Sequence, residues 1–251
     1  MNMMHEMENN GIGIDNWDAP IYRIFERKWL LELLRTQKNG LMPPASWDDP
    51  FENFFLQCKG VTNYGKEVSF QPLHDSWFGQ CWTLAAESDA MWRIYSKKES
   101  GVRVSTTIRK LFNSYYDKTD QFAALKFAIG KITYKTRTDI ENFLAGTSFA
   151  DLTMGGQIHG VAETLCIKRP EFSHEAEVRL LFHDAENKYI GSRVVLVPLS
   201  TAAVIDDVLL DPRIGSITVK RVTRELVNAG YSGPVSQSEL YKFTPPTIRL
   251  E

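Results

Sequence analysis

The sequence has few cysteines, with Cys58, Cys81 and Cys166 among 251 residues. They are odd in number, widely spaced and form no Cys-x-x-Cys pair. This pattern argues against a disulfide framework and against a thiolate zinc site. We therefore expect three buried thiols.

Long apolar runs and an excess of one charge are also missing. No segment approaches the roughly 18 to 20 apolar residues that span a bilayer, and residues 1–10 are polar and acidic where a signal peptide would be basic and then apolar. We expect a cytoplasmic protein with no membrane partner. The 29 basic and 31 acidic side chains give a net charge of −2, so only a local basic groove could attract nucleic acid.

Several catalytic motifs are absent, among them Gly-x-Gly-x-x-Gly, the Walker loop, Gly-x-Ser-x-Gly and His-Glu-x-x-His. Their absence argues against ordinary dehydrogenases, kinases, hydrolases and zinc proteases. His174 and His183 flank a predicted strand, but their spacing matches no common zinc pattern and strand alternation would point them in different directions. We expect no metal site.

The composition is that of an ordinary globular domain, with 43% hydrophobic residues. Residues 1–18 show no periodicity and are rich in Asn, Gly, Met and acidic residues, so we expect a loose leader, with order beginning near Pro20. No repeat, linker or charge block divides the remainder. This predicts a single domain over residues 19–251.

The predicted strands are separated by helices too often for a β-sandwich, yet they lack the regular alternation of a doubly wound sheet. The sequence therefore predicts an α+β fold with a mixed, mostly antiparallel sheet flanked by helices. Residues 136–160 are polar and compatible with helix, with breaks at Gly146, Gly155 and Gly156. Elsewhere the pattern predicts strands over residues 21–25, 78–84, 101–106, 123–135, 177–183, 192–197, 204–210 and 239–243, and helices over 29–40, from 49 onward, 88–96 and 216–229.

Two carboxylates stand where a predicted strand begins. On an extended backbone Glu175, Glu177 and Arg179 would share one face, because the side-chain period is two. This placement could direct a carboxylate into a cleft. The same residues could equally form a solvated strand face with an ion pair.

An aromatic pair and a basic residue are further candidates. Trp92 and Tyr95 lie three residues apart on one helical face, where they could sandwich a nicotinamide or adenine ring, or belong to the core. Arg23 lies in the first strand between apolar residues. It needs an anionic partner there, either a buried carboxylate or a ligand phosphate.

At these positions the chain resembles an uncharacterised bacterial family known as domain of unknown function 2971. The resemblance extends over most of the chain, and the family implies no activity. Its matching parts are Tyr22 and Arg23; Asp49, Pro50, Phe51 and Glu52; Met91, Trp92 and Tyr95 followed by Gly101 and Val102; Glu175, Glu177 and Arg179; and a closing strand, an Asp211 and Pro212 turn, a helix and a final strand.

The chain more distantly resembles ADP-ribosyltransferases, especially the DarT-type toxins that modify DNA, and the related RNA phosphotransferases. Those proteins open with a basic residue on the first strand, here Arg23. Much later a catalytic glutamate, often preceded by alanine, begins an apolar strand, here Ala176 and Glu177 followed by residues 178–182. The second family position, often Tyr or Ser-Thr-Ser, has no match.

This resemblance implies an ADP-ribosyltransferase-like fold and NAD as a substrate. Glu177 would bind the ribose hydroxyl and stabilise the oxocarbenium-like centre, with Glu175 beside it as the second expected catalytic carboxylate. Arg23 would hold the pyrophosphate or adenosine side, and Trp92 or Tyr95 would stack on a ring. We include Arg179 among the expected NAD-binding residues. The acceptor, nucleic acid or protein, is unassigned.

Two other functions fit the same residues. A metal-dependent nuclease or phosphodiesterase could bind magnesium through Asp49, Glu52, Glu175 and Glu177, with Arg179 or Arg23 on phosphate. A non-catalytic sensor or interaction domain, in phage defence for example, would use them as a core network. The sequence does not decide the oligomeric state.

Overall fold

A computed structural model of the chain describes residues 10–47, 49, 51–61, 64–116, 119–120, 122–146 and 158–249. Its largest feature, within these residues, is an eight-stranded sheet in the order β1-β8-β11-β6-β2-β7-β13-β14. These strands span Gly11–Ile12 (β1), Pro20–Glu26 (β2), Trp77–Thr83 (β6), Gly101–Thr107 (β7), Phe127–Lys131 (β8), Glu177–His183 (β11), Asp207–Leu210 (β13) and Val235–Gln237 (β14).

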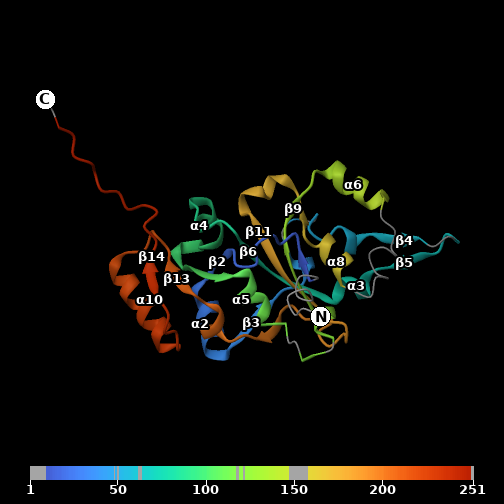
Figure 1. Cartoon of the computed structure of the whole chain (residues 1–251), viewed down its shortest axis with the longest axis horizontal. Helices are drawn as coiled ribbons and strands as arrows, with labels where there is room; N and C mark the ends of the chain where they lie inside the picture. The colour runs from blue at the N-terminus through green and yellow to red at the C-terminus, as the bar shows by residue number, and fades with distance from the viewer. Residues whose placement is uncertain are drawn as a thin grey trace.

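Shorter strands and helices surround this sheet (Figure 1). The pairs β3–β12, β9–β10 and β4–β5 each form a small sheet of their own. These strands span Lys38–Leu41 (β3), Lys59–Val61 (β4), Glu67–Ser69 (β5), Thr133–Tyr134 (β9), Ile167–Lys168 (β10) and Val195–Pro198 (β12). The α-helices span Arg27–Thr36 (α2), Gln71–Asp75 (α3), Asp89–Tyr95 (α4), Ile108–Asn113 (α5), Arg137–Gly146 (α6), His159–Thr164 (α8), Thr201–Val204 (α9) and Ser216–Asn228 (α10), and 3-10 turns include η2 (Phe55–Gln57) and η5 (Pro170–Glu175).

The main sheet is mixed and mostly antiparallel, as predicted. Its two outermost pairs, β1 with β8 and β13 with β14, are parallel, and the inner pairs are antiparallel. Helices α2 and α10 lie toward one end of the molecule and α6 and α8 toward the other (Figure 1). The predicted α+β class is therefore confirmed.

The sheet is split in its centre. Strand β7 pairs with β2 along its whole length, and β11 pairs with β6 in the same way. Between β2 and β6, by contrast, one register pair joins the described residues, Tyr22 with Thr83. From that junction the two strands diverge, so residues 23–26 and 79–82 face each other across a gap in the sheet.

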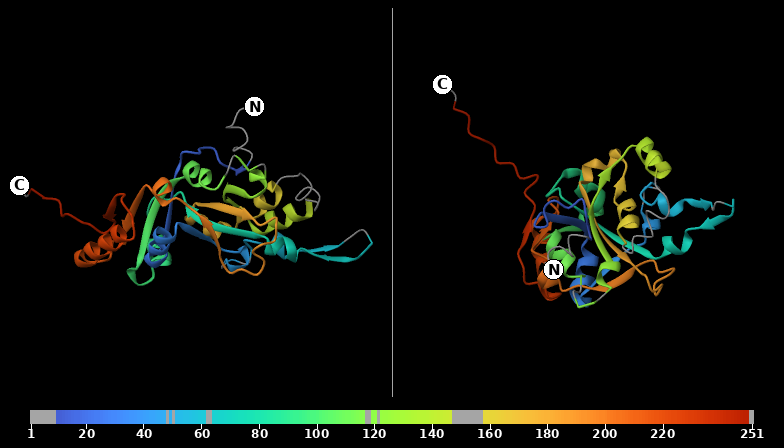
Figure 2. Two further views of the ribbon diagram at one scale, coloured as in Figure 1. Left: turned by 90° about the horizontal axis from the view of Figure 1, so that it is seen from below. Right: turned by 45° about the vertical axis from the view of Figure 1, so that its right-hand side comes forward.

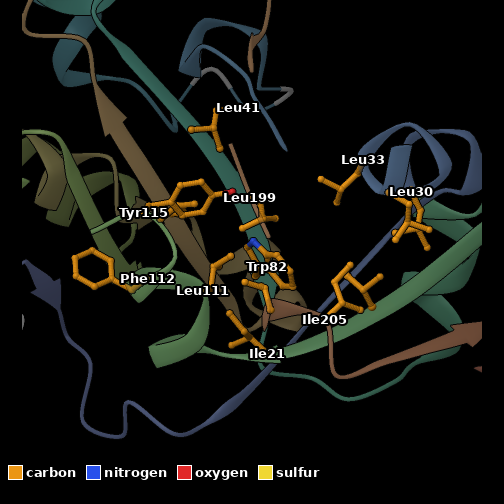
Figure 3. Close-up of a cluster of buried hydrophobic side chains, with 14 of the residues drawn as sticks. Ile21, Leu30, Leu33, Leu41, Trp82, Leu111, Phe112, Tyr115, Leu199 and Ile205 are labelled. Atoms are coloured by element: carbon orange, nitrogen blue, oxygen red, sulfur yellow. The ribbon is translucent and has the colours of Figure 1, made fainter. Parts of the chain in front are cut away.

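The larger hydrophobic core holds the split halves together. Helix α2 contributes Leu30, Leu33 and Leu34, whose spacing of three and four places them on one face of the helix. Figure 3 shows Leu30 and Leu33 on one side of this cluster near Ile205, with Ile21, Trp82 and Leu111 toward its middle and Phe112 on the far side. A second cluster packs α8 against β8 and β11.

Local sequence signals explain the best-predicted elements. The side chain of Ser88 accepts a hydrogen bond from the backbone N–H of Met91 and begins α4 as expected. Strand β11 has the predicted bounds, because Val178 and residues 180–182 are apolar and buried. Helix α10 ends one residue before the predicted end.

The expectation of a loose leader is wrong for residues 10–18. Ile12 lies on β1, which extends the sheet beside β8, and Trp17 packs in the larger core with its ring 5.5 Å from that of Phe112. The side-chain amide of Asn10 donates to the carbonyl of Phe127 at 2.6 Å. A two-residue strand is too short to show periodicity, so no local pattern predicts β1. Residues 1–9 lie outside the described residues.

Other elements also differ from expectation. The predicted helix over 29–40 ends at Thr36 and the chain continues into β3, and the predicted strand over 123–135 divides into a 3-10 turn, β8 and β9. Asp49 accepts a hydrogen bond from the Phe51 N–H, as a cap would, but the chain then turns and forms the 3-10 helix η2 instead of an α-helix; Pro50 lies outside the described residues. The predicted strand at 204–210 divides into α9 and β13. The last strand is Val235–Gln237, which pairs with β13, and not 239–243.

Two segments extend from the body of the protein. The β4–β5 hairpin projects from one end, and the segment after β14 leads away from the other (Figures 1 and 2). Across the described ranges, no helix combines the length and apolar character needed to cross a bilayer.

The place of Trp17 in the core can be tested by truncation. We expect Trp17→Ala to lower the free energy of unfolding by about 3 to 5 kcal/mol in urea titrations, because the change leaves a cavity beside Phe112. The control is Trp29→Ala, whose side chain is 59% exposed and should change stability by less than about 0.5 kcal/mol. Equal effects of the two changes would contradict the packing of residues 10–18.

Candidate functional site

The gap between β2 and β6 holds a cavity of about 860 Å³. One wall is strand β2 with Arg23, the other is β6 with Cys81 and the start of β11, and helix α4 borders the opening. Ligand sites commonly have volumes of roughly 300 to 1,000 Å³. The lining residues include Tyr22, Arg23, Phe25, Trp29, Trp47, Gln80, Cys81, Thr83, Met91, Arg93, Ile94, Tyr95, Lys97, Glu175 and Glu177.

Glu177, the first residue of β11, is held on this wall by an ion pair. Its Oε1 accepts a hydrogen bond from Arg179 Nε at 2.6 Å, and its Oε2 accepts from Arg179 Nη2 at 3.1 Å. Successive odd positions of the strand share a face, so the guanidinium lies next to the carboxylate. The side chains of Glu177 and Arg179 are 2% and 0% exposed. The predicted ion pair is present, but its alternative description as a solvated strand face is wrong.

The charges around Glu177 keep it ionised. Burial alone would raise the pKa of its carboxyl, but the charge and hydrogen bonds of Arg179, together with the charge of Lys168, outweigh burial and lower the pKa to about 2. The Cys81 thiol donates a hydrogen bond to the same carboxylate, and burial with the nearby Glu177 raises the pKa of Cys81. A carboxylate that is ionised at neutral pH therefore lines the cavity.

Glu175 reaches the same place by a different backbone path from the one predicted. It ends the 3-10 helix η5 and is not part of the strand, and Ala176 then adopts the left-handed conformation with φ of 43°. The Thr83 hydroxyl donates to the Glu175 carbonyl at 2.5 Å and fixes this turn against β6. Glu175 Oε1 accepts a hydrogen bond from the Tyr95 hydroxyl at 2.9 Å. The two glutamates lie together, as predicted, although strand alternation is not the reason.

The structure adds Lys168 to the site and places Glu52 beside it, an arrangement that the sequence does not predict. Lys168, on β10, has its Nζ 2.5 Å from Glu175 Oε2 and 3.0 Å from Glu177 Oε2. Glu52, a candidate magnesium ligand, lies 3.0 Å from Lys168 Nζ and 2.5 Å from Arg179 Nη2. Glu52 is separated by 127 positions from Arg179, so no local pattern could connect them.

The charge of Arg23, unlike the charges described above, is not neutralised by a neighbour that the structure describes. Among the described residues Arg23 has no hydrogen-bond or ion-pair partner; its guanidinium lies 4.9 Å from the centre of the Phe25 ring. The Arg23 side chain is half-buried and lines the cavity. Burial lowers its pKa. A buried carboxylate, one of the two partners expected for Arg23, is therefore not observed. The remaining expectation is an anionic ligand.

Trp92 and Arg179 do not have the positions expected of NAD-binding residues. Trp92 is fully buried beside Ile24 and Met91, and its Nε1 donates to Glu87 at 2.7 Å. The core alternative is therefore correct for Trp92, and its ring cannot stack on a ligand. Arg179 is enclosed by Glu177, Glu52, the Leu165 carbonyl and the Trp47 ring. A ligand in the cavity would therefore contact Glu177 and not Arg179.

The two histidines near β11, His174 and His183, lie in different surroundings. His174 is exposed, whereas the ring of His183 stacks on Trp77 at 4.9 Å. Within the described part of the chain, no group of three or more His, Cys, Asp or Glu side chains is arranged to hold a metal ion. Cys166 is a buried thiol as expected, but Cys58 and Cys81 are only half-buried.

One family model matches part of the chain. The sequence model of a family described as "Protein of unknown function (DUF2971)" matches residues 91–180. This match confirms the resemblance to that family over these residues, whereas the predicted matching positions before residue 91 and after residue 180 lie outside it. This segment runs from α4 into β11 and contains Lys168, Glu175 and Glu177. No curated protein matches the chain.

The chain is also similar to solved structures of DarT from Thermus sp. 2.9. The complex with NAD+ has a TM-score of 0.42 and 14% identity, over 89% of this chain and 97% of that chain. The complex with carba-NAD+ has a TM-score of 0.40 and 12% identity over the same shares. The complex with ADP-ribosylated ssDNA has a TM-score of 0.39 and 14% identity, over 88% and 95%.

The low pKa of Glu177 predicts a specific loss of stability in acid. Its pKa is about 2 in the folded protein and 4.5 ordinarily, so its stabilising contribution is present above about pH 4.5 and is lost as the pH falls toward 2. We expect the free energy of unfolding of the native protein to exceed that of Glu177→Gln at pH 6, by an amount that shrinks by roughly 3 kcal/mol as the pH approaches 2.

Urea titrations at several pH values between 6 and 3 would follow this difference over the measurable part of the range. Glu32→Gln, on the exposed face of α2, is the matched control and should give a curve parallel to the native one. Parallel curves for the native protein and Glu177→Gln would show that Glu177 is not a strongly ionised group in the fold.

Proposed function

We propose that the protein is an NAD-dependent ADP-ribosyltransferase that binds NAD in the cavity between β2 and β6. The observation that carries this proposal is the distribution of charge across the cavity. Arg23, which lacks an anionic partner among the described residues, lies on one wall, and the ionised Glu177 lies on the other with Glu175 beside it. NAD has a matching charge pattern, because its nicotinamide ring is cationic and its diphosphate is anionic.

The two ends of the ligand would occupy different walls. The diphosphate would bind Arg23, whose planar guanidinium can donate two parallel hydrogen bonds to phosphate oxygens. The nicotinamide and its ribose would lie by Glu177. A guanidinium in a partly desolvated cavity binds an anion more strongly than one in bulk water, because the surrounding dielectric constant is lower.

Glu177 would then act on the bond between nicotinamide and ribose. When this bond breaks, its electron pair leaves with the ring nitrogen, which becomes neutral, and positive charge develops on the ribose. A carboxylate already fixed beside the ribose stabilises this charge without reorganising, and such preorganised electrostatic contacts are a large source of catalysis. The acceptor then attacks the ribose carbon and loses a proton.

Aromatic contacts would come from Tyr95 and Trp29 rather than from Trp92. Both line the cavity, and their side chains are 38% and 59% exposed, so their rings can reach a ligand. The hydrogen bond from Tyr95 to Glu175 restricts the tyrosine ring at the opening. Stacking on such a ring adds affinity beyond the burial of surface area.

The nuclease alternative is less compatible with this geometry. Three of its four proposed ligands, Glu52, Glu175 and Glu177, surround Lys168, whose ammonium group lies within 3.0 Å of each of them. The fourth, Asp49, is paired with Arg169 at 2.9 Å. Magnesium would therefore have to displace existing cationic partners. A non-catalytic NAD sensor would share the binding geometry and differ only in turnover.

Binding can be tested by thermal denaturation with NAD. A ligand that binds the folded state raises the melting temperature, so we expect a saturable rise for the native protein and a much smaller one for Arg23→Ala. Arg224→Ala, on the exposed face of α10, is the matched control and should respond like the native protein. No rise for the native protein at millimolar NAD would contradict the proposal.

Turnover separates an enzyme from a sensor. We expect Glu177→Gln to release nicotinamide from NAD about 10² to 10³ times more slowly than the native protein, because the amide cannot stabilise the developing positive charge as a carboxylate does. Nicotinamide would be quantified chromatographically, with Glu32→Gln as the control and near-ultraviolet circular dichroism to verify folding. NAD binding with equal, negligible release by the native protein and Glu177→Gln would favour the sensor instead.

A further inference from the structure

Lys168 contacts both cavity-lining glutamates without lining the cavity itself. Its Nζ is 2.5 Å from Glu175 Oε2 and 3.0 Å from Glu177 Oε2, and its side chain is 6% exposed. A ligand in the cavity would therefore meet Glu175 and Glu177 but not Lys168. Any influence of Lys168 on chemistry must pass through these two carboxylates.

The two contacts fix how close the carboxylates are. With distances of 2.5 and 3.0 Å to one nitrogen, the two Oε2 atoms can lie no more than 5.5 Å apart. Two poorly solvated carboxylates at such a distance repel each other, and among the described residues Arg179 contacts Glu177 but not Glu175. A cation between them removes this repulsion.

Other groups around the cluster do not replace this contact. Arg179 on β11 contacts Glu177 and Glu52, and among the described residues Lys168 is the cation that touches both Glu175 and Glu177. Phe172 lies 4.7 Å from Lys168 Nζ and adds no charge. The remaining facing groups include the Glu52 carboxylate, which lies 3.0 Å from Lys168 Nζ. They also include the hydroxyls of Tyr95 on α4, donating to Glu175, and Tyr134 on β9, accepting from the Glu177 N–H, and the Cys81 thiol on β6.

We propose that Lys168 is a positioning residue that holds the carboxylates of Glu175 and Glu177 side by side at the cavity wall, with its charge offsetting the repulsion between them. Two carboxylates attract the cationic end of a ligand more strongly than one. The effect of Lys168 on the carboxylates is independent of the proposed function. Its effect on NAD cleavage rests on that function.

The ionisation of Glu177 can be followed directly. In protein labelled with ¹³C at the glutamate carboxyl carbons, the signal of Glu177 would be assigned by its loss in Glu177→Gln and titrated with pH. We expect Lys168→Met to raise the pKa of Glu177 by about 1 to 3, and Lys168→Arg to keep it near the native value. An unchanged Glu177 titration in Lys168→Met would overturn the proposal.

A double variant covers the case in which Lys168→Met does not fold. Lys168→Met with Glu175→Gln removes one positive and one negative charge together, so the repulsion disappears along with the cation that offset it. We expect this protein to fold and Glu177 to titrate near its native pKa. A double variant that fails to fold would show that Lys168 serves packing. A double variant in which the pKa of Glu177 is raised by about 1 to 3 would show that Lys168 does not act by offsetting Glu175.

Nicotinamide release distinguishes this inference from the proposed function. We expect the rate for Lys168→Met to fall on acidification at a pH about 1 to 3 higher than for the native protein, with Lys168→Arg restoring the native profile. Absence of release by every protein would defeat the transferase proposal, while the carboxyl titration would still decide the role of Lys168. An unshifted profile alongside normal native activity would contradict the role of Lys168 alone.

Discussion

The ion pair between Glu177 and Arg179 is the interaction on which the arrangement of the site depends. Both side chains are removed from water, and a buried charge is costly unless it is paired and hydrogen-bonded. Arg179 meets this requirement with Glu177, Glu52 and the Leu165 carbonyl, and these contacts bring the loop around residue 52 and the end of α8 to the strand. The pair thereby fixes the direction of Glu177, whose carboxylate remains on the cavity wall.

The split in the sheet explains why a charged cavity can exist in the middle of the fold. If β2 and β6 paired along their length, ladder hydrogen bonds would close the gap between Arg23 and Cys81. Because one register pair, Tyr22 with Thr83, joins them in the described residues, the strands separate. The cavity wall formed by β2 carries the positive charge of Arg23, and the wall formed by β6 and β11 carries the negative charge of Glu177. Arg23 and Glu177 belong to opposite halves of the sheet, so the larger hydrophobic core that joins the halves also sets their relative position.

Local chemistry determined which parts of this site could be predicted from the sequence. The bounds of β11 follow from its apolar run, and Arg23 stood out as a basic residue between apolar neighbours. The positive φ of Ala176, which takes Glu175 out of the strand, leaves no mark in a non-glycine residue. Lys168 lies on a two-residue strand, too short for a pattern, and its partners include Glu52 far away in the sequence. Trp92 shows the limit of spacing arguments, because an aromatic residue at helical spacing fits a core as well as a ligand site.

The most direct test of the account is a crystal structure of Glu177→Gln with NAD, in which slow turnover would preserve the dinucleotide. We expect electron density for NAD between β2 and β6, with the diphosphate on Arg23 and the nicotinamide ribose beside residue 177. Density for NAD elsewhere on the protein, or an empty cavity at a saturating concentration of NAD, would contradict the assignment of this cavity as the NAD site.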